Sequence, residues 1–262
     1  MKVAANGIEV NFTLEGPEDA PVVTFSHSLA TDLSMWAPQG EALRDHFRLL
    51  FYDTRGHGAS DAPDAAYSFD QLTDDVRELL RALNIERTHF VGLSMGGMIG
   101  QTLALRHPEV VDGLVLSSTA SAMPPAAPDM WKERIATVRE RGMEAMVGPT
   151  IERWFTPGFI AKHDNVVEPV RDMIRATPVA GFAGCGQAIM NLNLTDKLPG
   201  ITAPTLVMVG EEDPGTPVAA HELIRDKVPG AKLIVLPSAM HLSNIEQADK
   251  FNAALLDFLN GL

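Results

Sequence analysis

Six short apolar runs that alternate with helical patterns restrict most strongly what this chain of 262 residues can fold into. The runs are rich in leucine and β-branched residues and stay apolar at successive positions, which is typical of parallel strands covered on both faces. Strands that alternate with helices over most of a chain predict an α/β fold, in which helices wrap a parallel sheet. The runs are Pro21–Phe25, Arg48–Tyr52, Thr88–Leu93, Val110–Ser117, Pro204–Val209 and Ala231–Leu236.

The segments between these runs have the periodicity of helices. Phe69–Leu83 gathers its leucines on one stripe, and Ser68 is placed to act as its N-cap. Met95–Arg106 is small and apolar on all sides, which predicts a buried helix. Two further helices are predicted over Val218–Lys227 and Ile245–Leu259, and an Asn-Gly pair predicts a hairpin within Val3–Thr13.

The segment from 121 to 195 breaks this alternation. It contains no convincing strand, and prolines are frequent where it begins. Amphipathic helical patterns then follow one another over Met130–Arg141, Val147–Phe155, Val166–Ala176 and Phe182–Met190. We therefore expect residues 121–195 to form a helical cap on a core that consists of residues 1–120 and 196–262.

The charge balance excludes several functions. Lysine and arginine number 21 against 34 aspartates and glutamates, which gives a formal net charge of −13. Binding to nucleic acid or to an anionic membrane needs a basic face, so we expect neither partner. The single cysteine cannot form an internal disulfide, no apolar run approaches the ~18 residues of a membrane span, and the first residues lack the apolar segment of a signal peptide. These features predict a cytoplasmic protein.

The pentapeptide Gly92-Leu93-Ser94-Met95-Gly96 lies between a predicted strand and a predicted buried helix. A Gly-x-Ser-x-Gly in this position forms a nucleophile elbow, a strained turn that lifts the serine hydroxyl above the sheet. The glycines let the strand and the helix approach closely, and the helix N-terminus favours developing negative charge. Ser94 is therefore the predicted nucleophile, and an inert serine in a tight turn is the alternative.

A serine nucleophile needs a base, and in the hydrolase topology that uses such an elbow the base is the last member of the triad along the chain. His241 is the predicted base, because it lies on the loop after the last predicted strand. The other histidines after Ser94 have structural positions: His107 ends a helix, His163 lies in the predicted cap and His221 falls inside a helix.

The base in turn needs a carboxylate that orients it, and three acids compete on the loop after Pro204–Val209. Asp213 is best placed, because it follows the turn glycine by three residues and precedes a helix. Glu211 and Glu212 are expected to be solvated loop charges. Two backbone N–H groups are expected to form the oxyanion hole, those of Met95 and Leu29.

Together with these residues, Tyr52-Asp53-Thr54-Arg55-Gly56-His57-Gly58-Ala59-Ser60 resembles the α/β-hydrolase superfamily over essentially the whole chain. The resemblance implies a mostly parallel eight-stranded sheet flanked by helices, with a helical cap insertion. Within the superfamily, four segments are similar to the 3-oxoadipate enol-lactonases of bacterial aromatic-acid degradation. They are Ser28–Trp36, Arg153–Pro157, Thr177–Pro178 with Gly181–Cys185, and His241–Gln247.

This resemblance implies a small-molecule substrate, an enol-lactone with a carboxymethyl arm, that is opened to 3-oxoadipate through an acyl-enzyme on Ser94. It implies neither a metal nor an organic cofactor. Closely related carboxylesterases have the same motifs, so a broad-specificity carboxylesterase, with perhydrolase side activity, is the second hypothesis. A small-molecule receptor with a slow triad is the hypothesis that involves no enzyme.

Several large side chains are candidates for the wall of a substrate pocket, namely Trp36, Trp131 and Trp154. An anionic lactone that enters a chain of net charge −13 needs a local cation. Arginine suits a carboxylate best, because its planar guanidinium binds both oxygens. The predicted cap offers Arg134 first and Arg153 second, with packing and ion pairing as their alternative roles.

Overall fold

The computed structural model describes residues 1–262 and contains one sheet of eight strands in the order β1-β2-β4-β3-β5-β6-β7-β8. Strands β1 and β2 form an antiparallel hairpin, β2 pairs antiparallel with β4, and all other neighbours are parallel. The strands are β1 Lys2–Ala5, β2 Ile8–Glu15, β3 Val22–Ser26, β4 Arg48–Tyr52, β5 Thr88–Leu93, β6 Val111–Ser117, β7 Thr205–Gly210 and β8 Lys232–Leu236. The predicted α/β fold and hairpin are confirmed.

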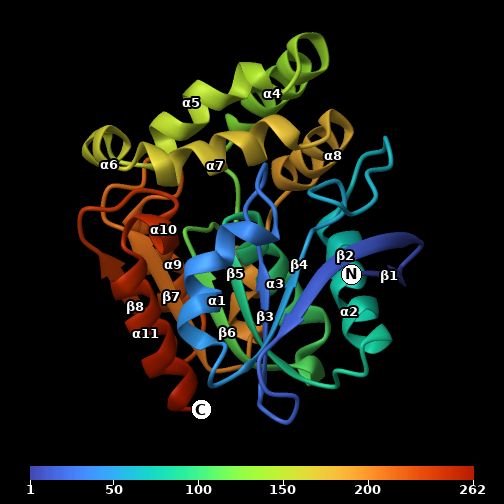
Figure 1. Ribbon diagram of the computed structural model, residues 1–262, viewed down its shortest axis with the longest axis vertical. Helices are drawn as coiled ribbons and strands as arrows, with labels where there is room; N and C mark the ends of the chain where they lie inside the picture. Colours follow the sequence, from blue (N-terminus) through green and yellow to red (C-terminus); the bar gives the residue numbers. More distant parts are fainter.

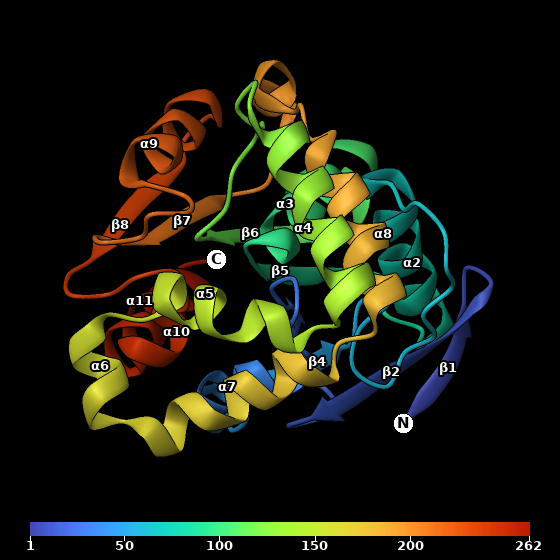
Figure 2. The same cartoon turned by 90° about the horizontal axis from the view of Figure 1, so that it is seen from above.

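Helices cover both faces of this sheet. Helix α3 packs on β3, β5 and β6, with α2 beside it, whereas α1 and α11 pack together on the other face (Figure 2). These helices are α1 Ala37–Leu43, α2 Phe69–Ala82, α3 Met95–Arg106, α9 Val218–Lys227, α10 Ser243–Glu246 and α11 Ala248–Asn260. The predicted N-cap of α2 is confirmed, because the Ser68 hydroxyl accepts a hydrogen bond from the N–H of Gln71 at 3.2 Å.

Two predictions about the C-terminal part are wrong. The single helix expected over Ile245–Leu259 is divided into α10 and α11, because Gln247 has φ −126° and ψ 48°, outside the helical region. Strand β8 was expected to be apolar and covered on both faces, but it is the last strand of the sheet and pairs only with β7. Lys232 and Val235 are consequently exposed.

Five helices lie between β6 and β7 and stand along one edge of the sheet (Figure 1). We call them the cap helices: α4 Ala127–Arg141, α5 Glu144–Trp154, α6 Pro157–Lys162, α7 Asp164–Ala176 and α8 Val179–Met190. Four of them contain the predicted helical patterns. The fifth, α6, was not predicted, since its six residues are too few for a periodicity to be recognised.

The cap helix α8 touches the loop after β4 at a point where only glycine fits. A Cβ atom on Gly181 would collide with the backbone of Gly56, and Gly56 itself has φ +84°. Nearby, the N–H of Tyr67 donates to the carbonyl oxygen of Gly184 at 3.2 Å. Helix α8 is therefore held against the core by direct contact between two stretches of backbone.

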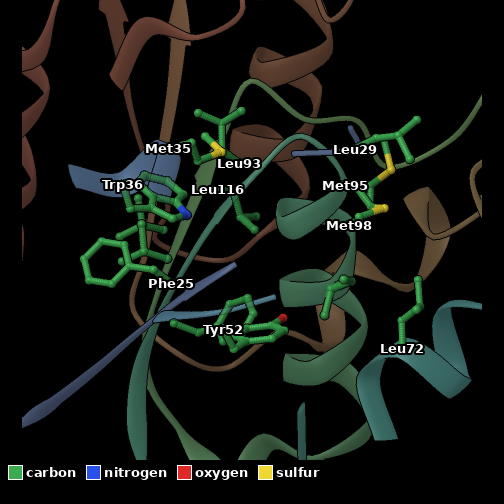
Figure 3. Packing of buried hydrophobic residues seen from close by; sticks show 14 of the residues in the cluster. Phe25, Leu29, Met35, Trp36, Tyr52, Leu72, Leu93, Met95, Met98 and Leu116 are labelled. Carbon is green, nitrogen blue, oxygen red and sulfur yellow. The ribbon is translucent and has the colours of Figure 1, made fainter. Parts of the chain in front are cut away.

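The hydrophobic core fills the space between the sheet and its helices. Figure 3 shows Phe25 of β3, Leu93 of β5 and Leu116 of β6 in this core, with Met95 and Met98 of α3 nearby. None of the helices combines the length and the apolar character that a bilayer span requires.

Candidate active site

Ser94 occupies the turn between β5 and α3 with φ 56° and ψ −113°. A non-glycine residue in such a conformation costs on the order of 1–3 kcal/mol, so the surroundings must hold it in place. The N–H of Ser94 donates to the carbonyl oxygen of Ser117 at 2.9 Å, and its own carbonyl oxygen accepts from the Thr119 hydroxyl at 2.8 Å. The strained turn is thereby tied to the end of the neighbouring strand.

The flanking glycines explain why this turn can form. A Cβ atom on Gly92 would collide with the backbone of Gly96, and a Cβ atom on Gly96 would collide with the backbone of Ser26. Strand β5, helix α3 and the end of β3 therefore meet backbone to backbone around Ser94. This packing matches the nucleophile elbow that the sequence predicts.

Asp213 and His241 are joined by a hydrogen bond of 2.8 Å, in which Nδ1 of the imidazole donates to Oδ2 of the carboxylate. The carboxylate also accepts from the N–H groups of Gly215 and Thr216 and from the Thr216 hydroxyl. Burial alone would raise the pKa of Asp213, but the charge of His241 and the hydrogen bonds from His241 and Thr216 lower it to about 2. The carboxylate thus stays ionised beside the imidazole. Glu211 and Glu212 are exposed.

The remaining histidines that follow Ser94 are engaged elsewhere. His107 lies beside Asp74, and His163 is exposed at the start of α7. His221 is buried in α9, where its Nε2 accepts from the N–H of Thr119 at 2.8 Å. His241 is the one histidine that lines the same cavity as Ser94.

The loop after β3 presents a free backbone donor next to the elbow. The N–H groups of Leu29 and Met95 donate to no acceptor within the protein. Ala30 has φ +62°, and its N–H donates to Nε2 of His57 at 3.0 Å. His27 ties the same loop to the loop after β4, since its Nε2 accepts from the N–H of Thr54 at 2.9 Å. Burial lowers the pKa of both imidazoles, that of His57 to about 3.

Ser94 and His241 open into a cavity of about 520 Å³ between the sheet and the cap helices. Most of its wall is apolar. The charged side chains of the lining are Arg134 and Arg153, and the lining contains no aspartate or glutamate. Large apolar members of the wall are Met98, Met123, Trp131, Met146, Trp154 and Phe182.

Both arginines lack a carboxylate within ion-pair distance. The guanidinium of Arg134 lies over the ring of Trp131, 5.1 Å from its centroid. Arg153 is half-buried, and its Nε has no hydrogen-bond partner. Burial lowers the pKa of the Arg153 guanidinium, while Asp213 raises it in part.

Of the predicted pocket tryptophans, Trp131 and Trp154 line the cavity, and the ring of Trp154 stacks on that of His241 at a centroid distance of 6.1 Å. Trp36 does not. It is fully buried in the core, with its ring 5.1 Å from Phe25 and 6.3 Å from Phe251. Figure 3 shows it beside Phe25 and Met35. The prediction that Trp36 contacts substrate is corrected: large aromatic residues serve cores as readily as pockets.

Two residues near the nucleophile are not predicted from the sequence. Thr119 holds the carbonyl oxygen of Ser94, and His221 holds the N–H of Thr119. The sequence indicates only that His221 lies inside a helix, where it is not expected to act as the base. Neither residue belongs to a local pattern, so no signal in the sequence marks them.

A serine on a strained strand–helix turn, beside an Asp–His pair on a largely parallel sheet, defines an α/β hydrolase. The family model described as "alpha/beta hydrolase fold" matches residues 21–248, and the chain belongs to this family.

Individual relatives are similar over nearly their whole length. "3-oxoadipate enol-lactonase 2" of Acinetobacter baylyi is 37% identical over 253 residues, which cover 97% of this chain and 94% of that protein. The structure of the enol-lactonase from Burkholderia xenovorans LB400 has a TM-score of 0.96 and 40% identity, covering 99% of this chain and 100% of that one. A thermophilic esterase from Thermogutta terrifontis, solved with malate bound, has a TM-score of 0.95 and 28% identity, covering 100% and 98%.

Proposed function

We propose that this protein is a serine hydrolase that opens a small lactone bearing a carboxylate, with 3-oxoadipate enol-lactone as its substrate. One observation carries the proposal. The chain has a net charge of −13, yet the cavity beside Ser94 contains two arginines and no carboxylate. Such a local inversion of charge suits an anionic substrate. The similarity to enol-lactonases supports the choice of this particular anion.

In the proposed reaction Ser94 Oγ attacks the lactone carbonyl carbon while Nε2 of His241 takes the hydroxyl proton. Asp213 holds Nδ1 of the imidazole and stabilises the imidazolium without becoming protonated, which fits its pKa of about 2. The N–H groups of Leu29 and Met95 receive the developing oxyanion. The ring C–O bond then breaks, and its oxygen leaves as an enolate, which takes the proton from the His241 imidazolium and so leaves an enol and a neutral imidazole.

The second half of the reaction releases the acyl group. A water molecule gives a proton to Nε2 of His241 and attacks the acyl-enzyme, and Ser94 leaves with a proton returned by the imidazolium. The enol of the product becomes the ketone of 3-oxoadipate. Each step is proton transfer and acyl transfer, so the reaction needs no metal and no organic cofactor.

The substrate carboxylate is proposed to bind one of the two cavity arginines. Arg134 presents its guanidinium from the face of Trp131, which keeps the planar group oriented. Arg153 is the second candidate. Its Nε is buried and donates to no acceptor in the protein, and a substrate carboxylate would satisfy this donor. We further propose that residues 121–195 act as the substrate-binding cap on a core of residues 1–120 and 196–262.

We also propose that the protein works in the cytoplasm, in the β-ketoadipate pathway of aromatic-compound degradation. The single cysteine and the similarity to enol-lactonases support this proposal.

A broad-specificity carboxylesterase is the second candidate, which the mainly apolar wall of the 520 Å³ cavity and the similarity to an esterase favour. Turnover of 3-oxoadipate enol-lactone and of a neutral aryl ester by the purified protein separates the two functions. A lactonase is expected to have a kcat/KM for the lactone that is roughly 10- to 150-fold higher, since only that substrate engages a cavity arginine through a charge-assisted hydrogen bond of ~1.5–3 kcal/mol. Equal values would indicate the general esterase. If the protein turns over neither substrate, the remaining hypothesis is a small-molecule receptor with a slow triad.

A further inference from the structure

Glu246 is a buried carboxylate on α10 whose charge has no cationic partner within ion-pair distance. Three donors converge on its two oxygens. The N–H of Met240 donates to Oε2 at 2.8 Å, while the N–H and the hydroxyl of Thr156 donate to Oε1 at 2.9 Å and 2.5 Å. Met240 belongs to the core, and Thr156 lies between the cap helices α5 and α6 as the N-cap of α6, so one carboxylate joins the core to the cap helices. Figures 1 and 2 show α10 beneath the junction of α5 and α6.

The residues that Glu246 joins are the neighbours of the proposed base and of its stacking partner. Met240 immediately precedes His241, and Thr156 follows Trp154 by two residues. A second link runs in parallel, because the N–H of Leu242 donates to the carbonyl oxygen of Trp154 at 3.1 Å. The ring of Trp154 lies over the imidazole of His241, with an angle of 20° between the two planes.

We infer that Glu246 is a positioning residue, which sets the imidazole of His241 relative to Ser94 and to the α5 wall of the cavity. The inference rests on the proposed serine-hydrolase function. Asp213 fixes the imidazole through one ring nitrogen, and this single hydrogen bond leaves rotation about it open. Glu246 limits this freedom by holding Met240, directly before His241, and Thr156, two residues after the tryptophan that covers the imidazole ring.

The role requires a carboxylate rather than an amide. Both oxygens of Glu246 accept hydrogen bonds, so an amide at this position would turn its NH₂ group toward one of the donors. A buried carboxylate that loses its donors is also costly, so the His241 loop and the α5–α6 junction stay together. The Glu246 carboxylate thereby positions both His241 and the α5 wall of the cavity.

The experiment compares Glu246→Gln with Asp249→Asn, which removes a nearby exposed negative charge of α11 and serves as the matched control. Active sites are counted with a fluorophosphonate that labels the nucleophilic serine, and turnover of a neutral aryl ester is expressed per labelled site. We expect Glu246→Gln to lower kcat per site by roughly 10- to 100-fold with little change in KM, as for a misplaced catalytic group. Asp249→Asn should keep the wild-type value.

A milder pair of variants tests the cap side of the link and guards against misfolding of Glu246→Gln. Thr156→Val removes the hydroxyl donor and should lower kcat per site roughly 3- to 10-fold, and Thr156→Ser should restore it. A wild-type kcat per labelled site in both Glu246→Gln and Thr156→Val, with only fewer sites or a lower Tm, would overturn the inference. Ser94→Ala is measured alongside: activity in that variant would refute the proposed function itself, independently of Glu246.

Discussion

The N–H of Ala30 donates to Nε2 of His57 across 3.0 Å, and this contact fixes the loop that carries the proposed oxyanion donor Leu29. Because Nε2 accepts, the proton of the neutral ring is on Nδ1, which faces the carbonyl oxygen of Arg55 at 3.3 Å. Ala30 has φ +62°, a conformation that an alanine adopts only under constraint. An imidazole that does not line the cavity thus supports the turn that carries the proposed oxyanion donor.

Replacing this acceptor should weaken catalysis. In His57→Phe the N–H of Ala30 loses its partner, and we expect kcat to fall by roughly 10²–10³-fold, which is the usual effect of losing one oxyanion donor. His57→Gln retains an acceptor and should lose much less. Steady-state kinetics of both variants checks this, together with circular dichroism to verify folding. A folded His57→Phe enzyme with a normal kcat would show that the loop after β3 keeps its conformation without the hydrogen bond to His57.

Asp213 should be distinguishable from the two acids beside it. Asp213→Asn is expected to lower kcat by roughly 10⁴-fold, because the amide favours the wrong imidazole tautomer. Glu212→Gln removes the same charge from an exposed neighbour and is expected to change kcat less than about twofold, as is usual for a solvated charge. Turnover of an aryl ester by both purified variants provides the comparison. Comparable losses in the two would mean that the carboxylate of the triad is assigned incorrectly.

The two cavity arginines should separate charged from neutral substrates. A charge-assisted hydrogen bond contributes ~1.5–3 kcal/mol, so Arg134→Met should lower kcat/KM for the enol-lactone by roughly 10- to 150-fold. Hydrolysis of a neutral ester, which has no carboxylate to lose, should hardly change. Arg153→Met is measured in the same way. If both substrates suffer equally in a variant, that arginine is structural; if neither arginine discriminates, the general esterase is favoured.

Acid should destabilise the fold through histidines that are buried without charge. Burial lowers the pKa of His57 to about 3 and that of His221 to about 4, from 6.5. Below pH 6.5 these histidines bind protons in the unfolded chain but not in the folded chain. The stability of the fold therefore decreases as the pH falls from 6.5 toward the lowered pKa values. The free energy of unfolding should drop by about 2 kcal/mol per histidine between pH 7 and pH 5.

Urea denaturation at several pH values measures this effect. Asp213 does not interfere with this measurement. Its pKa is lowered from 3.8 to about 2, so the stability that its ionised form contributes is lost only as the pH falls below about 3.8. His57→Gln should reduce the pH dependence by the share of one histidine. A free energy of unfolding that is constant from pH 7 to pH 5 would contradict the assignment of these imidazoles as neutral and buried.

Local patterns were enough to predict the elements around Ser94. The elbow depends only on the five residues Gly92–Gly96. Its two glycines stand where the backbone of β5 meets α3 and where α3 meets the end of β3, so a side chain would collide there. The strand β5 and the helix α3 have the predicted bounds for the same reason. The pairing of Asp213 with His241 was predicted from chain order, since both follow neighbouring strands of one parallel sheet.

Features that depend on distant contacts were not predictable. Trp36 is apolar and bulky in any context, and only the positions of Phe25 and Phe251 decide that it fills the core. The exposure of β8 depends on its being the last strand, which a run of apolar residues does not reveal. Glu246 is surrounded by ordinary helical residues in sequence, and its partner Thr156 lies 90 positions away.

The contact between Gly56 and Gly181 limits how such enzymes can be recombined. Since neither position tolerates a side chain while the other remains in place, the loop after β4 and helix α8 form a matched pair. A chimera that takes its cap helices from one hydrolase and its sheet from another would need to inherit both glycines, or to carry a compensating shift of α8. Grafting the substrate preference of one family member onto another is therefore also a problem of backbone fit between helix α8 and the loop after β4.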